Sequence, residues 1–268
     1  PYLFKDQIDQ GIKEIAKNYI KTEVRFKELN VSFFTHFPKL TVTLTESSIQ
    51  GASPFENASV VRAKQIALGV DLPSLLGDKI IFNELFIDEA SIELQIDSLG
   101  RNNYDVMVPT DELNEQESSP VGLILNDIRI TNSNVVYKDQ VTKVELDLKG
   151  LDYNGLLDFR NNQLTLNADL AIKQSLFTFD QEKYIKNLPL AGHVQTVIDM
   201  ERLFFDFKDN QLKLAEFPFE LKGTFQLLEE QSNYDLKITS NKNQLSSIPP
   251  IVPETYQEYF KALQLGGT

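Results

Sequence analysis

Apolar and polar residues alternate along most of this chain, and the alternation is first clear in the segment 23–44. On either side of Phe37-Pro38 the segment has a period of two, which is the pattern of a half-buried β-strand. The apolar positions are Val24, Phe26, Leu29, Val31 and Phe33 before the proline, with a slip of one residue after Phe26, and Leu40, Val42 and Leu44 beyond it. We therefore expect two antiparallel strands joined at the proline.

A helical period replaces the alternation near both ends of the chain. In residues 4–20 apolar side chains recur every three or four positions, which predicts an amphipathic helix with one buried face. Acidic and basic residues share its polar face, so we expect it to pack on the sheet rather than lie on a membrane, where Lys and Arg predominate. Residues 245–253 contain three prolines that halt the sheet, and residues 254–265 predict a short second helix.

Between these helices the alternation predicts a mainly β fold. Shorter strands are expected at 66–72, 80–87 and 90–96, followed by a turn at 97–105. The clearest runs lie at 144–149, 164–173 and 217–227, and the last two exceed the usual strand length of about five or six residues. We expect an elongated, curved, mostly antiparallel sheet shaped like a gutter.

The acidic, proline-ended segment 110–120 is the one convincing linker. The predicted division is therefore 1–109 for a helix-plus-sheet domain, 110–120 for the linker, 121–247 for a second sheet module and 248–268 for the helical start of a further repeat. Residues 157–166 and 205–214 share most of their sequence, and both are predicted to be a strand, an Asn-rich turn and a strand. Duplication and the chance likeness of two hairpins both explain this similarity.

The composition of the chain disfavours or excludes several classes of function. The chain has 26 basic and 39 acidic residues, a net charge of −13, which disfavours nucleic acid because phosphates need clustered Lys and Arg. There is no cysteine, so disulfides and thiol catalysis are excluded, and no apolar run is long enough to span a membrane. The chain opens at Pro1 without an initiator methionine, and we expect that a segment upstream was removed.

Residues suited to catalysis are scarce. The two histidines, His36 and His193, lie far apart among strand residues, and a surface role is favoured for His193. No catalytic or phosphate-binding motif is present, and most acidic residues alternate with apolar ones, as on the solvated face of a strand. We predict no enzymatic activity, no metal and no cofactor.

The N-terminal residues resemble the AsmA family, especially its Bacteroidetes forms. The resemblance rests on the spacing of SFFTHFPKLTVTL at 32–44, followed by DSLGRNNYD at 97–105, and it covers about the first 105 residues. It implies a protein held in the inner membrane by a helix upstream of Pro1, with its body in the periplasm. Such proteins are similar to the chorein and TamB group, whose sheets carry phospholipids between membranes during assembly of the outer envelope.

The resemblance and the alternation together predict a non-enzymatic lipid carrier. An acyl chain of about 16 carbons costs on the order of 13 kcal/mol to hold in water, so only a continuous apolar track could carry it. The residues predicted to line this track are Leu146, Leu148, Leu164, Leu166, Leu170, Ile172, Phe219, Leu221, Phe225 and Leu227.

Two alternatives remain open. The same residues could form the core of a closed β-sandwich that binds another envelope protein, because both arrangements need one wet and one dry face. An enzyme acting on envelope glycans would need two close carboxylates, and the sequence nominates no such pair.

Overall fold

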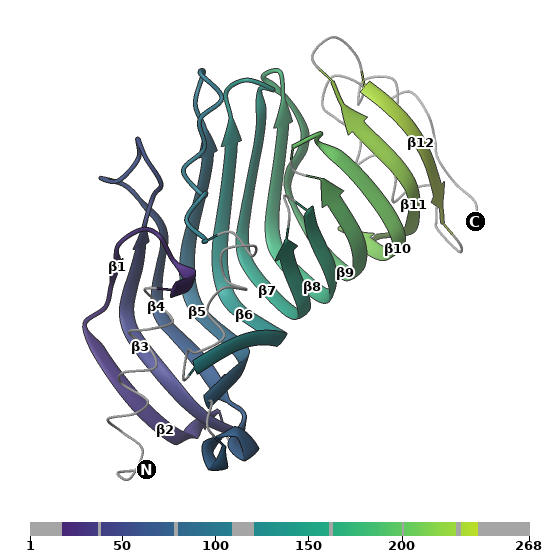
Figure 1. The fold of residues 1–268 in the computed structure, drawn as a ribbon. Coiled ribbons are helices and arrows are strands. Elements are labelled where there is room, and N and C mark those ends of the chain that lie inside the picture. Colours follow the sequence, from purple (N-terminus) through teal and green to yellow (C-terminus); the bar gives the residue numbers. More distant parts are fainter. Residues whose placement is uncertain are drawn as a thin grey trace, which may run out of the picture. The chain divides into compact units, whose positions relative to one another are not determined.

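The computed structural model describes residues 18–36, 39–77, 80–108, 121–160, 163–199, 201–228 and 232–240. The chain divides into two compact units, Pro1–Ser133 and Asn134–Thr268, which we call the N-terminal and C-terminal units. Their strands form one open, mostly antiparallel sheet in the order β1-β3-β4-β5-β6-β7-β8-β9-β10-β11-β12, and β2 also pairs with β3 (Figure 1). The predicted mainly β class is confirmed, and the described strands form one sheet rather than the two of a sandwich.

The strands are long, as the alternation predicted. They are β1 (Val24–Arg25), β2 (Glu28–His36), β3 (Lys39–Gln50), β4 (Ser59–Val70), β5 (Ile80–Ile96), β6 (Val121–Asp139), β7 (Val144–Arg160), β8 (Gln163–Phe179), β9 (Glu182–Asp199), β10 (Phe204–Leu214), β11 (Phe217–Leu227) and β12 (Ser232–Thr239), with a short 3₁₀ helix, η2 (Leu72–Leu76), between β4 and β5. Most of the predicted N-terminal helix, the linker 110–120 and the C-terminal helix lie outside the described residues. The boundary between the compact units falls within β6.

The antiparallel pair predicted around Phe37-Pro38 is present as β2 and β3. The single run expected before the proline is two strands, because the chain leaves the sheet at Phe26 and Lys27, and both β1 and β2 pair with β3. This break lies where the sequence slips by one residue, next to Glu46, which has a φ of +47° and accepts a bond from Lys27. The slip therefore marks a bend in the sheet.

The apolar side of the N-terminal unit is sealed. Val42 and Phe82 have no exposed surface, and Leu44 and Val70 are also buried against them. The two apolar runs predicted at 80–87 and 90–96 are one strand, β5, in which Glu89 has a φ of +51° and the alternation changes sides. In the N-terminal unit the apolar side of the sheet is therefore a packed core.

The predicted turn at 97–105 is confirmed and is organised by Asp97. Its carboxylate accepts hydrogen bonds from the backbone nitrogens of Leu99 and Arg101 at 2.9 Å and from the Arg101 Nε at 2.8 Å. These bonds, that of the Arg101 side chain foremost, lower the pKa of Asp97.

Because the pKa of Asp97 is lowered by folding, its contribution to stability is present above the unfolded pKa and is lost as the pH falls through the folded value. We expect the amide signals of Leu99 and Arg101 to titrate with a midpoint below 3.8, the ordinary value. An NMR titration checks this, and Asp97→Asn should abolish the transition. A midpoint at or above the ordinary value would contradict the assignment.

In the C-terminal unit the strands bend along their length (Figure 1). Glycines allow neighbouring backbones to approach closely at the bends. Gly192 in β9 has a φ of +142°, and a Cβ there would lie 2.0 Å from the Gln211 carbonyl oxygen. Gly223 in β11 has a φ of +115°, and its Cβ would lie 1.9 Å from the Asp235 oxygen. Neither position can hold a larger residue without displacing the next strand.

Gly192→Ala is therefore expected to lower the free energy of unfolding by about 2–4 kcal/mol, from backbone strain and overlap with β10. Gly100→Ala is the matched control, because Gly100 also has a positive φ, +77°, but nothing lies within 4 Å of its Cβ position. The control should cost about 1 kcal/mol. Urea unfolding followed by circular dichroism measures both, and equal losses would show that the close approach of β10 does not matter.

One sequence prediction is wrong. Residues 157–166 follow the predicted pattern, since they run from the end of β7 into β8, but residues 205–214 lie within the single strand β10 and contain no turn. Between Phe207 and Asn210 the register with β11 shifts instead, so the chain forms a bulge there. Asn210 favours the bulge because its amide bonds the backbone of both neighbouring strands.

Candidate functional site

One face of the C-terminal unit carries most of its large apolar side chains. Residues that pair directly in antiparallel strands point to the same face. The register joins Leu164, Ile198, Phe205, Phe225 and Tyr234 into one such row across five strands. A second row contains Leu166, Thr196, Phe207, Gly223 and Leu236. We call the side on which these rows lie the apolar face.

Along some strands the apolar positions switch between even and odd residue numbers. The side chains nevertheless stay on the apolar face, because a bulge lies at the switch. In β8 the apolar positions change from even numbers, ending at Ile172, to odd numbers, beginning at Phe177. Between them Lys173 and Gln174 lie opposite Pro189 alone, as the register of β8 and β9 shows. In β7, Gly150 lies level with this bulge and has a φ of +63°. Because the bulge adds one residue, the apolar side chains beyond it point to the same face as those before it. Both halves of each strand are therefore apolar on the same side.

Asn210 stabilises a similar bulge in β10. Its side chain is 1% exposed; its Oδ1 accepts bonds from the Gln195 nitrogen at 3.1 Å and the Thr196 hydroxyl at 2.8 Å. Its Nδ2 donates to the carbonyl oxygens of Gln195 and Leu221, each at 3.3 Å. The bulge therefore joins β9, β10 and β11, and it turns Phe205 and Phe207 toward the apolar face.

The apolar face contains a partly open cavity of about 420 Å³. Its lining residues come from two regions of the strands and are Val144, Phe177, Phe179 and Tyr184 on one side and Phe205, Phe207, Phe225, Leu227 and Ser232 on the other. Tyr184 lies near the start of β9, whereas Phe205 pairs with Ile198 near its end. A straight strand would separate these positions by about 45 Å, so β9 must bend back on itself. The cavity is therefore a groove between the two halves of the bent strands, which we call the two arms of the sheet.

Aromatic rings form most of the groove wall. Phe205 lies 5.9 Å from Phe225 and 6.2 Å from Phe207 between ring centroids, and Phe177 lies 6.0 Å from Tyr184. These separations are normal for favourable aromatic pairs. None of the described residues that line the groove is charged. The site can therefore hold hydrocarbon but offers little for charge recognition or acid–base chemistry.

All ten residues predicted to line an apolar track lie on the apolar face, as the strand register shows. Phe225 and Leu227 line the cavity itself. Of the ten, Ile172 is buried, at 5% exposed, and the other nine are only partly buried. This contrasts with Val42 and Phe82 in the N-terminal unit, which are fully enclosed. The predicted residues are thus brought onto one face, and that face is not a sealed core.

Sequence reasoning missed seven of the nine lining residues. The signal was present in the alternating aromatics of LFTF at 176–179 and FDF at 205–207. The LFTF segment is separated by a bulge from the run that ends at Ile172, so the change of parity concealed that it lies on the same face. The FDF segment precedes the Asp-Asn pair that predicts a turn, so it was not joined to the track.

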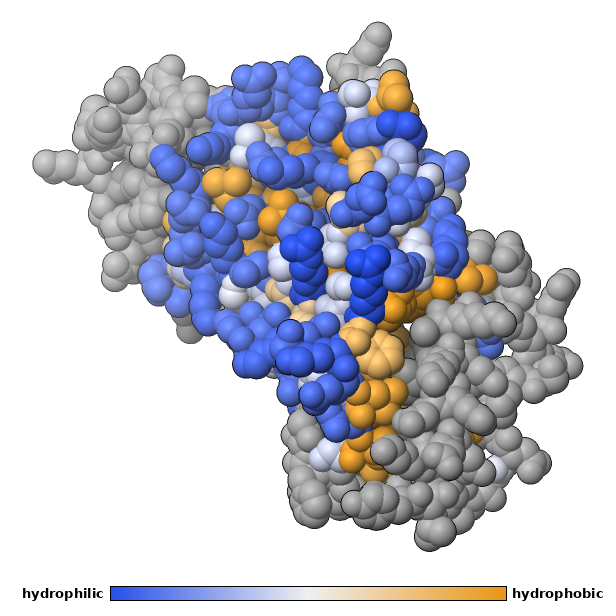
Figure 2. All heavy atoms as spheres, turned by 90° about the vertical axis from the view of Figure 1, so that its left-hand side faces the viewer, coloured by the Kyte–Doolittle hydropathy of each residue, from blue (hydrophilic) through white to orange (hydrophobic). Residues whose placement is uncertain are grey.

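The opposite face of the C-terminal unit is polar. Lysines and carboxylates pair across it, as in Lys222–Asp209 at 3.3 Å and Lys149–Asp147 at 3.6 Å. His193 also lies there, with its Nδ1 3.0 Å from Asp169, which confirms the surface role, although it sits within β9 rather than at a strand start. Figure 2 looks from the side of β1, in the N-terminal unit, and there too hydrophilic residues cover much of the described surface, with hydrophobic ones between them and along one border.

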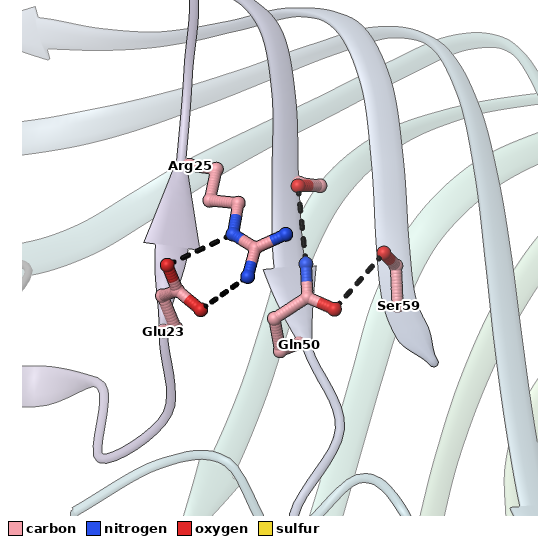
Figure 3. Close-up of polar contacts among 5 residues, drawn as sticks. Glu23, Arg25, Gln50 and Ser59 are labelled. Carbon is pink, nitrogen blue, oxygen red and sulfur yellow. Dashed lines mark hydrogen bonds and ion pairs between the residues drawn. The ribbon is translucent and has the colours of Figure 1, made fainter. Parts of the chain in front are cut away.

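A second cavity, of about 520 Å³, lies in the N-terminal unit and is polar. Its lining is Lys21, Thr22, Glu23, Gln50, Gly51, Ala52, Ser53, Glu56 and Asp105. Figure 3 shows that Arg25 binds both oxygens of Glu23, at 2.7 and 2.8 Å, and that the Ser59 hydroxyl donates to Gln50. The bond from Arg25 lowers the pKa of Glu23. Lys21 pairs with Asp105 at 2.7 Å, so three of the charged lining groups, Lys21, Glu23 and Asp105, already have an ionic partner.

Within the described ranges no three His, Cys, Asp or Glu side chains are grouped so that they could hold a metal ion. No helix in that part of the chain is both long and apolar enough to cross a membrane.

Comparison with known proteins gives little guidance. No protein-family model matches the chain. The chain is 25% identical over 186 residues to exodeoxyribonuclease I of Buchnera aphidicola subsp. Schizaphis graminum (strain Sg). The alignment covers 65% of this chain, which thus spans about a third, 36%, of that protein's length. The similarity is too low and too partial to assign a family.

Proposed function

We propose that the C-terminal unit is a non-enzymatic lipid-handling module, whose groove shields the acyl chains of a phospholipid or a similar lipid from water. The observation that carries the proposal is the aromatic cavity between the two arms of the sheet. Its volume, about 420 Å³, falls within the range of roughly 300–1,000 Å³ that is usual for small-molecule sites. Apolar cavities much smaller than this bind hydrocarbons such as benzene.

The groove can shield hydrocarbon at little electrostatic cost. Each methylene moved from water into the groove contributes roughly 0.8 kcal/mol, and none of the described lining residues carries a charge that would have to be desolvated. Because nine of the ten predicted residues keep some exposure, the apolar face can accept a chain without unfolding. A sealed core like that around Val42 and Phe82 could not.

The cellular role proposed here rests on the resemblance to the AsmA family. It places the protein in the periplasm, anchored in the inner membrane and acting in lipid transport for outer-membrane assembly. The alternative is a structural module that binds another envelope protein. The open groove favours the lipid role, because a purely structural module would not need an accessible aromatic cavity.

Native mass spectrometry of the protein purified from cells under mild conditions tests the proposal. We expect an added mass of a lipid in part of the population, and stoichiometric uptake when a delipidated sample meets phospholipid micelles. Failure to co-purify lipid, together with no uptake of added lipid, would contradict the proposal.

Nuclease activity is the second candidate, favoured only by the similarity to exodeoxyribonuclease I. Nucleases commonly use two metal ions held by carboxylates. Several of the described carboxylates instead pair with lysine or arginine, as Asp209 and Asp199 do, and no three potential ligands are grouped among the described residues. The net charge of −13 also opposes DNA binding. Incubation with end-labelled single-stranded DNA and Mg²⁺ decides the matter: we expect intact DNA, and metal-dependent shortening would establish the nuclease.

A further inference from the structure

The last strand of the sheet presents an exposed apolar face at its edge. All eight residues of β12 are exposed, and β12 is terminal in the order of the described strands. Tyr234, Leu236 and Ile238 are 73%, 38% and 61% exposed, and they continue the rows of the apolar face. An exposed apolar edge strand is a template for pairing with another strand.

The sequence of β12 is complementary to itself when two copies run antiparallel. If the two-fold axis passes between the Leu236 residues of two copies, Asp235 of each lies opposite Lys237 of the other. In the same register Tyr234 faces Ile238, so apolar residues meet on one face and opposite charges on the other. A shift of two residues in either direction would destroy the charge match, since it would place Asp235 opposite Asp235 or Lys237 opposite Lys237.

We propose that β12 is a homotypic interface, through which two copies of this chain join edge to edge around a two-fold axis at Leu236. Each copy would supply the same strand, as in any isologous contact. Opposite charges and paired apolar residues directly across two antiparallel strands are stabilising, whereas like charges there are destabilising. The proposal is independent of lipid binding, because it uses only the edge of the sheet.

A disulfide trap tests the register. The chain has no cysteine, so Leu236→Cys introduces a single thiol per copy. Directly opposed residues in antiparallel strands have Cα atoms about 4.5–5.5 Å apart, within the range that a disulfide spans. We expect mild oxidation to convert Leu236→Cys into a covalent dimer. Val141→Cys is the control, because Val141 is also exposed, at 49%, but lies in the turn between β6 and β7, and it should remain monomeric.

Charge reversal tests the pairing without any cross-link. Light scattering from about 1 μM to 1 mM protein should show a concentration-dependent dimer. Asp235→Lys alone and Lys237→Asp alone each create two like-charge pairs and should raise the dissociation constant by at least about fivefold. The double variant restores opposite charges, so its dissociation constant should lie within about twofold of that of the parent protein.

Several results would overturn the proposal. These are a parent protein that stays monomeric across the whole range, equal oxidation of the two cysteine variants, or a double charge variant that dimerises no better than the single ones. Circular dichroism confirms that each variant folds.

Discussion

Phe225→Lys is expected to reduce lipid uptake by at least about tenfold. Phe225 lies in the groove, where its ring is 5.9 Å from that of Phe205, and none of the described lining residues carries a carboxylate to pair with an ammonium group. Placing a charge in an apolar cavity costs more than the roughly 1.4 kcal/mol that corresponds to a tenfold loss. Mass-spectrometric titration with phospholipid measures the effect.

Thr224→Lys is the matched control for this variant. Thr224 is the preceding residue of β11 and points to the polar face, where it pairs with Asp206 on one side and Asp235 on the other. A lysine there gains two carboxylate neighbours, so uptake should stay at the parental level. Equal uptake by the two variants would show that the groove is not where lipid binds.

Asn210→Ala is expected to lower the free energy of unfolding by about 2–5 kcal/mol. Removing the side chain leaves the Thr196 hydroxyl and the Gln195 nitrogen without the oxygen that they now share. Each buried polar group left unpaired costs about 1–3 kcal/mol. Urea unfolding at neutral pH measures the loss.

The control for Asn210→Ala is Asn167→Ala, because Asn167 is exposed in β8, which β9 separates from β10. It should change stability by no more than about 0.5 kcal/mol. Because the bulge at Asn210 also turns Phe205 and Phe207 toward the groove, lipid uptake should fall in the first variant alone. A small loss of stability, comparable with that of the control, would mean that the bulge does not depend on this amide.

Much of the fold followed from alternation alone. A period of two identifies strands, and it correctly predicted that Leu164 and Leu166 share one face with Phe225. What alternation could not reveal is the bulge, because a single extra residue looks like the end of one strand and the start of another. In β5 the alternation changes sides at Glu89, which has a φ of +51°, and so it predicts two runs, at 80–87 and 90–96, where the sheet has one strand.

The groove could not be predicted from the sequence, because it depends on how the strands bend. Phe177 and Phe205 are brought to one cavity by the bending of β9, and the bend depends on backbone geometry at positions such as Gly150 and Gly192. A glycine in a strand signals a bulge or a close approach but not its direction. The turn predicted around Asn210 is wrong because Asp-Asn is typical of a turn, whereas here the Asn210 amide bonds two neighbouring strands.

The account depends on hydrocarbon entering the groove of the C-terminal unit, and photocrosslinking tests this most directly. A phospholipid with a diazirine on its acyl chain is bound and illuminated, and the modified residues are located by peptide mass spectrometry. We predict labels on groove residues such as Phe177, Phe207 and Phe225, and their loss in Phe225→Lys. Labels confined to the polar face, or no labels at all at saturating lipid, would contradict the account.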